Sequence, residues 1–212
     1  MVKFLRTITT ILTVSVAVNA FAGCPKTEKD IALEALLDKL WREKRLTVED
    51  MAQVSDCIVI GKVRKLMVRK DESFVYRDRE CRIPVPMPEI RTYVTLVPKK
   101  FLRKPEGVDP GKKITIRYPG GEVIEGGIGQ VSEPNFVGGS PKFDPGQEVL
   151  VFLVAVEDGL YYKLVLDGEG EYTVKGGKVF PLHGVHARTD GTGLSVEEVR
   201  KRIEKALIKG KK

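Results

Sequence analysis

The sequence predicts a mainly β protein in which a small antiparallel barrel lies between an N-terminal and a C-terminal helix. From Cys57 to Phe180 the chain consists of β-branched and aromatic runs separated by Gly and Pro, which is typical of short strands joined by turns. On either side of this segment, apolar residues recur at helical spacing, over 28–44 and 195–210. No internal repeat or long linker divides the β segment, so we expect one barrel domain over 47–182.

The first 23 residues have the layout of an export signal. Lys3 and Arg6 precede an uncharged stretch that ends near Ala20-Phe21-Ala22, where small residues occupy the two positions that a signal peptidase recognises. The stretch is shorter and more polar than the roughly 20 apolar residues of a membrane span. We therefore expect residues 1–23 to be removed and the mature protein to be secreted, periplasmic or anchored to the cell envelope.

Two modes of cleavage fit this signal. Phe21-Ala22-Gly23-Cys24 resembles the lipobox of bacterial lipoproteins, in which the cysteine is lipidated and becomes the first residue. Ordinary cleavage after Ala22 fits equally well and leaves a soluble product. Association with a membrane is expected only through a lipid on Cys24.

The cysteine count predicts one disulfide bond. Three cysteines in an exported chain leave one without a partner. If Cys24 is lipidated or unpaired, Cys57 and Cys81 remain, and an oxidising compartment favours a bridge between them. Two buried free thiols are the alternative.

Capping residues predict where each helical part begins. Thr27-Glu28-Lys29-Asp30 resembles a capping box and opens an N-terminal helical region, 24–46. Thr47 can cap a further helical turn that leads into the first strand. At the other end, Ser195-Val196-Glu197-Glu198 is a full capping box. It predicts that the C-terminal region, 183–212, is a loop followed by an amphipathic helix with a basic tail.

Alternation and turn residues predict the strands. Gly61 interrupts CIVIGKVRKLMV (57–68), as expected where one strand bends sharply to serve two sides of a small barrel. In RTYVTLVPKKFL (91–102) and KKITIRY (112–118), successive residues alternate between two sets of side chains, as expected of strands whose two faces differ. VLVFLVAV (149–156) is unbroken apolar, so we expect the most buried strand there, covered on both faces. Further strands are expected at 122–131, 160–166, 171–174 and 178–180.

Two long connections interrupt the β segment. The first, 69–90, carries Pro84, Pro86 and Pro88. Since proline cannot donate a ladder hydrogen bond, we expect an extended segment or a sheet edge there. A clamped loop and a proline-rich ligand for a partner are the two interpretations. The second, 130–144, is rich in Gly, Pro and Ser and indicates an exposed loop.

Five segments over 47–182 carry a resemblance to known families. They are TVEDMAQVSDCIVIGKV, YVTLVPKKFL, ITIRYPGGE, FDPGQEVLVFL and GEGEYTV. Their order resembles a largely uncharacterised family of exported prokaryotic domains, some of which accompany secreted metalloproteases. More distantly, the pattern resembles the netrin-like domain of tissue inhibitors of metalloproteinases. That resemblance implies an OB-like, five-stranded barrel. It does not imply inhibition through a free N-terminal cysteine, because Cys24 would follow Gly23 or carry a lipid.

An OB-like barrel implies a binding role on one sheet face and its rim loops. The aromatic residues expected to contribute are Tyr93, Tyr118, Phe136 and Phe143. The expected partner is a protein or an envelope polymer. An alternative is the regulation or inhibition of a secreted protease.

The sequence contains no pattern that requires catalysis. None of its serines lies in a Gly-x-Ser-x-Gly elbow, and GGIG (126–129) lacks the lysine of a phosphate loop. His183 and His186 are close in sequence, but zinc usually takes at least three protein ligands. We expect two solvated loop histidines, no cofactor and no catalytic residue, with a metal-dependent hydrolase using both histidines as a second alternative.

The charge distribution does not favour nucleic acid. The chain carries a net charge of +7, and loss of Lys3 and Arg6 with the signal lowers it by two. The densest basic stretch, 200–212, contains no aromatic residue, whereas nucleic-acid binders combine basic and stacking side chains. We therefore expect no nucleic-acid partner.

Overall fold

The computed structural model describes twelve segments of the chain. They are residues 27–43, 46–71, 75–77, 82–84, 89–105, 107–109, 111–125, 128–132, 143–156, 159–167, 170–182 and 193–209. Within them the protein is mainly β with three α-helices, which confirms the predicted β character and the flanking helices. The predicted signal, Cys24, Cys81, Phe136, His183 and His186 lie outside the described residues.

The elements follow one another in a simple order. Helices α2 (Glu28–Glu43) and α3 (Val48–Val54) come first and α4 (Val196–Lys209) comes last. Between them lie β1 (Cys57–Asp71), β2 (Val75–Arg77), β3 (Arg82–Pro84), β4 (Glu89–Arg103), β5 (Ile114–Pro119), β6 (Gly121–Glu125), β7 (Ile128–Ser132), β8 (Glu148–Val156), β9 (Tyr161–Leu164), the 3-10 turn η2 (Val165–Asp167), β10 (Glu171–Lys175) and β11 (Lys178–Pro181).

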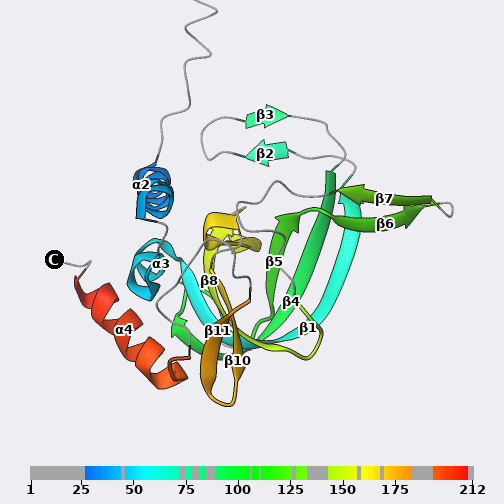
Figure 1. Ribbon diagram of the computed structural model, residues 1–212. Coiled ribbons are helices and arrows are strands. Elements are labelled where there is room, and N and C mark those ends of the chain that lie inside the picture. The colour runs from blue at the N-terminus through cyan, green and yellow to red at the C-terminus, as the bar shows by residue number, and fades with distance from the viewer. Residues whose placement is uncertain are drawn as a thin grey trace, which may run out of the picture.

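Five strands form a closed ring. The main sheet has the order β1-β4-β5-β9-β8-β10-β11, and β1 also pairs with β8. The pairs are antiparallel except at the junction of β5 and β9. Strands β10 and β11 form a hairpin that extends the sheet from β8. In Figure 1 the three helices lie on one side of the sheet and the β6–β7 hairpin projects on the opposite side.

Strand β1 closes the ring because it uses both of its edges. One edge pairs with β4 along the whole strand, while the other pairs with β8 over Cys57–Lys62. The register with β4 shifts between Ile60 and Gly61. A Cβ atom at Gly61 would lie 2.8 Å from both Leu96 Cγ and the Val97 carbonyl oxygen. The predicted bend therefore lies where two strands approach too closely for a side chain.

Alternate residues of β1 and β8 face two separate cores. The interior of the ring holds Cys57, Val59, Val63, Val94, Leu96, Ile114, Ile116, Tyr118, Phe143, Val149, Val151, Leu153, Tyr162 and Leu164. The second core, between the sheet and the helices, includes Ile58, Ile60, Leu150, Phe152 and Val154, together with buried residues of all three helices. Strand β8 is therefore covered on both faces, as its unbroken apolar run predicts.

Capping boxes start the helices as predicted. Asp30 N donates to Thr27 Oγ1 (3.2 Å), Asp50 N donates to Thr47 Oγ1 (3.1 Å), and Glu198 N donates to Ser195 Oγ (3.2 Å). In each box the acidic side chain accepts a hydrogen bond from the backbone N–H of the capping residue. These bonds satisfy amides that would otherwise lack partners at the helix start.

Ion pairs join the helices to one another. The guanidinium of Arg202 on α4 makes two bonds of 2.6 Å to the carboxylate of Glu49 on α3. Lys39 on α2 contacts both carboxylate oxygens of Asp50 on α3, at 2.8 and 2.7 Å. Lys29 on α2 pairs with Asp56, which precedes β1. None of the helices in the described part of the chain has both the length and the apolar character that a bilayer span requires.

The structure differs from the predicted strands at two places. The strand expected over 122–131 is a hairpin of β6 and β7, and Glu125 pairs with Ile128 across the reversal. Two glycines, 126 and 127, separate these strands, and Gly-Gly favours the tight turns of hairpins. The connection 69–90, expected as an extended segment or sheet edge, contains the last residues of β1, the first residues of β4 and a short antiparallel pair of strands, β2 and β3.

We predict that Gly61→Ala destabilises the protein by roughly 1–3 kcal/mol, because the new methyl group must displace backbone as well as the Leu96 side chain. Gly111→Ala is the matched control, since nothing lies within 4 Å of a Cβ atom there, and its effect should stay within about 0.5 kcal/mol. Urea unfolding of both variants checks this. Equal stabilities would contradict the close approach of β1 and β4.

We also predict that Asp50 stabilises the protein in a pH-dependent way. Partial burial alone would raise its pKa, but hydrogen bonds from Lys39 and Thr47 outweigh this and lower the pKa below its ordinary value. The unfolded state then binds more protons at acid pH, so this contribution is present above the unfolded pKa and is lost as pH falls through the folded pKa.

The difference in unfolding free energy between wild type and Asp50→Asn should therefore shrink from about pH 6 to about pH 3. Asp109→Asn, at an exposed position, serves as the control and should show no such trend. A constant difference for Asp50→Asn over this range would contradict the ionic role of Asp50.

Candidate functional site

The aromatic residues predicted to bind a ligand lie in two different environments. Tyr118 and Phe143 are inside the ring, 9 % and 3 % exposed, with ring centroids 6.4 Å apart. Burial raises the pKa of Tyr118 to about 12, although a hydrogen bond with Thr92 opposes the shift. Both side chains contribute to the core. Tyr93 instead points away from the interior, since its neighbour Val94 points into it.

A continuous surface surrounds Tyr93 on the outside of the ring. Residues that directly pair across a sheet share a face, and Tyr93 pairs with Met67 on β1 and with Arg117 on β5. We define the cationic face as the outward side chains of these strands and β9. They are Lys62, Lys65, Met67, Arg69 and Asp71 of β1, Arg91, Tyr93, Thr95 and Val97 of β4, Thr115 and Arg117 of β5, and Tyr161 and Lys163 of β9. The position of Glu89, which pairs with Asp71, lies at the end of the same face.

Two arginines and two tyrosines form a row across this face. The guanidinium carbon of Arg69 lies 4.2 Å from the centroid of the Tyr93 ring. The Tyr93 and Tyr161 rings meet edge to face, with centroids 5.8 Å apart. The guanidinium carbon of Arg117 lies 4.7 Å from the Tyr161 centroid. Cations at these distances are attracted by the ring quadrupole, so the row holds both guanidinium groups in place.

Asp71 fixes the end of this row that lies on β1. Its carboxylate accepts a hydrogen bond from the Tyr93 hydroxyl (2.6 Å) and from Arg69 Nε (3.1 Å), and Arg91 Nε lies 3.6 Å from it. Burial, together with the bond to Asp71, raises the pKa of Tyr93. The pKa of Arg69 is raised first by its hydrogen bond with Tyr93 and further by the charge of Asp71. The tyrosine therefore stays a neutral donor and the arginine stays charged.

The cationic face carries more positive than negative charge. Its cationic positions are Lys62, Lys65, Arg69, Arg91, Arg117 and Lys163, and its acidic positions are Asp71 and Glu89, which pair with each other across β1 and β4. Arginine presents a planar set of donors that fits a carboxylate or a phosphate in a bidentate way. This surface can therefore bind an anionic group.

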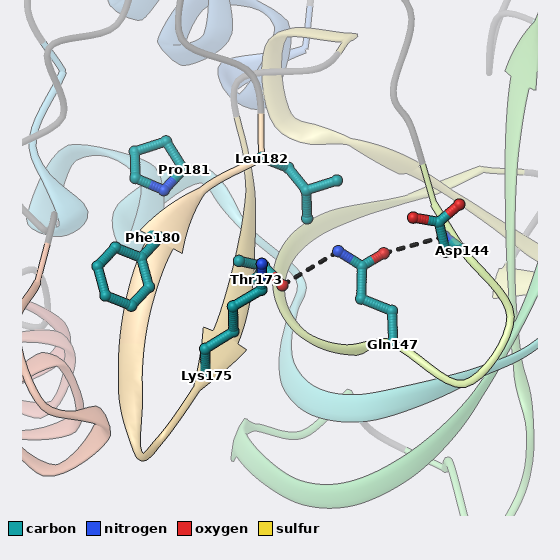
Figure 2. Close-up of a pocket in the computed structure, with 7 residues that line it drawn as sticks. All are labelled: Asp144, Gln147, Thr173, Lys175, Phe180, Pro181 and Leu182. Carbon is teal, nitrogen blue, oxygen red and sulfur yellow. Dashed lines mark hydrogen bonds between the residues drawn. The ribbon is translucent and has the colours of Figure 1, made fainter.

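A groove lies beside β10 (Figure 2). It has a volume of about 530 Å³ and is lined by Asp144, Gln147, Thr173, Lys175, Phe180, Pro181 and Leu182. Gln147 Nε2 donates to Thr173 Oγ1 (3.0 Å), and Gln147 Oε1 accepts from Asp144 N (2.9 Å). In Figure 2, the Phe180 ring points away from these bonded groups. Because ligand pockets need polar groups that converge on a ligand, we interpret this amide as a structural tie between a turn and β10.

The described residues contain neither a cluster suited to metal binding nor a reactive cysteine. They contain no cluster of three or more His, Cys, Asp or Glu side chains that could hold a metal ion. Cys57 is a free thiol with no exposed surface. Burial, with a smaller contribution from the charge of Asp56, raises its pKa to about 12. A thiol that is neutral at physiological pH and closed to solvent is not a nucleophile.

The predicted bridge between Cys57 and Cys81 stays a prediction, because Cys81 lies outside the described residues. The same holds for lipidation of Cys24, for a role of Phe136, and for metal binding by His183 and His186. Arg69, Arg117 and Tyr161 are the site residues that the sequence analysis missed. Arg117 alternates with Ile116 in KKITIRY, which indicates an outward side chain, but its position beside Tyr161 depends on the β5–β9 junction.

We predict that Cys57 resists thiol reagents in the native protein. In a Cys24→Ser/Cys81→Ser variant, Cys57 is the remaining thiol, and its burial and raised pKa should slow labelling by at least about 100-fold relative to the unfolded chain. Quenching the labelling reaction at successive times, followed by mass spectrometry, measures the labelling rates of the native and the unfolded protein. Labelling of the native protein as fast as of the unfolded chain would contradict the buried position of Cys57. Separately, the mass of the wild-type protein reports whether the bridge between Cys57 and Cys81 forms.

No protein-family model matches the sequence, and comparison with curated proteins finds no match. The family resemblance described above therefore stays a prediction.

Proposed function

We propose that this protein is an exported, non-enzymatic binding domain of OB-like fold, which holds a protein or an envelope polymer on its cationic face. Export is supported by the charged, apolar and small-residue layout of 1–23. Anchoring through a lipid on Cys24 and free secretion are the two forms that this layout allows.

The strand order supports an OB-like fold. In chain order the ring strands are β1, β4, β5, β8 and β9, and around the ring they run first, second, third, fifth, fourth. The third and fifth strands, β5 and β9, meet in parallel and the other pairs are antiparallel. This is the order of OB-type barrels, in which the second and third strands form the face that binds ligands.

The position of the Arg–Tyr row is the observation that carries the proposal. The second and third strands are β4 and β5, and they supply Tyr93 and Arg117. The neighbouring strands β1 and β9 supply Arg69 and Tyr161, which stack on or beside them. The Arg–Tyr row thus coincides with the face that an OB-like fold uses for binding.

Site-specific photo-crosslinking tests this function without knowledge of the partner. A photoreactive phenylalanine analogue replaces Met67, which is 39 % exposed on the cationic face, or Lys205, which is exposed on α4. The full chain is expressed in its own cells and irradiated. We expect covalent adducts from position 67 and none from position 205. A discrete added mass indicates a protein, and a broad distribution indicates a polymer.

Absence of adducts at position 67, or equal adducts at both positions, would contradict binding through this face. Circular dichroism of the purified substituted proteins confirms that each one is folded before the result is interpreted.

A further inference from the structure

We propose that the partner is a protein that presents carboxylate side chains to Arg69 and Arg117. This inference rests on the proposed function, because it specifies what the cationic face binds. Of the two partner classes, a protein or an envelope polymer, the charge of the face and the exposure of its aromatic rings favour a protein.

Charge complementarity is the first argument. The face has six cationic and two acidic positions, Asp71 and Glu89, so its net charge is positive. The bonds of Asp71 to Arg69 and Tyr93 lie within the row. A surface of one sign attracts a partner of the opposite sign and repels others. Arg69 keeps about half of its side chain exposed, 48 %, while bonded to Asp71. Its outer edge is thus open to a second acceptor.

The exposure of the aromatic rings separates the partner classes. A sugar or a base stacks on an open aromatic face, but Tyr93 is only 4 % exposed and lies under Arg69. Arg117 lies over the ring of Tyr161, which is partly exposed. The rings therefore support the guanidinium groups rather than form an open platform for stacking. Arg69, whose side chain is about half exposed, presents its guanidinium to solvent, which suits a carboxylate.

The apolar part of the face also fits a protein. Met67 and Val97 are 39 % and 37 % exposed on the same face. Tyrosine, methionine and arginine are enriched in protein interfaces, and tyrosine and arginine dominate their binding energy. An acidic segment with apolar neighbours can cover Met67 and Val97 while its carboxylates reach the arginines.

The row is ordered before the partner arrives. Arg69 is held by Tyr93 and Asp71, and Arg117 is held by Tyr161. Arginine side chains have many rotamers, and fixing them on binding costs free energy. Since stacking has already restricted these two side chains, less is lost when a carboxylate binds. The arginines are thus placed as anchors for the partner.

Fluorescence anisotropy with three labelled probes of similar charge tests this chemistry. The probes are a ten-residue glutamate peptide with two central leucines, an oligogalacturonate and a single-stranded oligothymidylate. The mature protein, Arg69→Ala/Arg117→Ala and Lys201→Ala/Lys205→Ala are compared at low salt. The second double variant removes the same charge from exposed positions of α4 and is the matched control.

We expect the peptide to bind most tightly, about tenfold weaker binding for the arginine variant, and less than about twofold change for the lysine variant. Arg69→Lys/Arg117→Lys keeps the charge but loses the planar donors, so it should also weaken binding. Thermal unfolding verifies that all variants are folded.

Three results would overturn the inference: no binding of the peptide, tighter binding of the oligogalacturonate or the oligothymidylate, or equal losses in the arginine and lysine variants. The first two leave the proposed function intact if position 67 still gives crosslinks. If position 67 gives none, the proposed function fails as well, so the two failures are distinguishable.

Discussion

Pairing of β1 on both edges is the constraint on which the rest of the structure depends. Strand β1 pairs with β4 on one side and with β8 on the other, and this double pairing turns an open sheet into a ring. The ring then has an inside and an outside, so every strand in it must alternate between them. Gly61 permits this closure because no Cβ atom fits between β1 and the backbone of β4 there.

Closure also determines which surfaces remain for binding. The outside of β8 and of the first part of β1 packs against the helices, through Ile58, Leu150 and Phe152 among others. Apart from the Arg103 end of β4, which contacts α3 and α4, no described helix covers the outside of β4 and β5 (Figure 1), and most of its side chains are polar, aromatic or basic. Asp71, Arg69 and Tyr93 form a bonded group on this open side. The cationic face is therefore the part of the ring that the helices leave uncovered.

Features encoded by neighbouring residues could be predicted from the sequence. The capping boxes at Thr27, Thr47 and Ser195 depend on groups three residues apart, and all three form. The two-sided burial of β8 follows from its apolar run. The same alternation in KKITIRY that places Arg117 outside places Tyr118 inside with Ile114 and Ile116, so a surface role for Tyr118 conflicts with the pattern of its own strand.

The composition of the cationic face could not be predicted, because it depends on register between distant strands. Arg69 lies beside Tyr93 only after the register of β1 and β4 shifts between Val63 and Lys65. Tyr161 reaches Tyr93 through the parallel junction of β5 and β9, which joins residues more than 40 positions apart. The proline-containing segment favoured an extended chain or a sheet edge, and the pairing of β3 with β2 again depends on residues that are not neighbours in sequence.

The ring itself is tested most directly by nuclear Overhauser effects in the mature, isotope-labelled protein. The account predicts cross-strand contacts between Val59 and Val151 on β1 and β8, and between Ile116 and Tyr162 on β5 and β9. It also predicts contacts between the rings of Tyr93 and Tyr161. A spectrum that shows the pairing of β1 with β4 but lacks the contacts between β1 and β8 would contradict the closed ring.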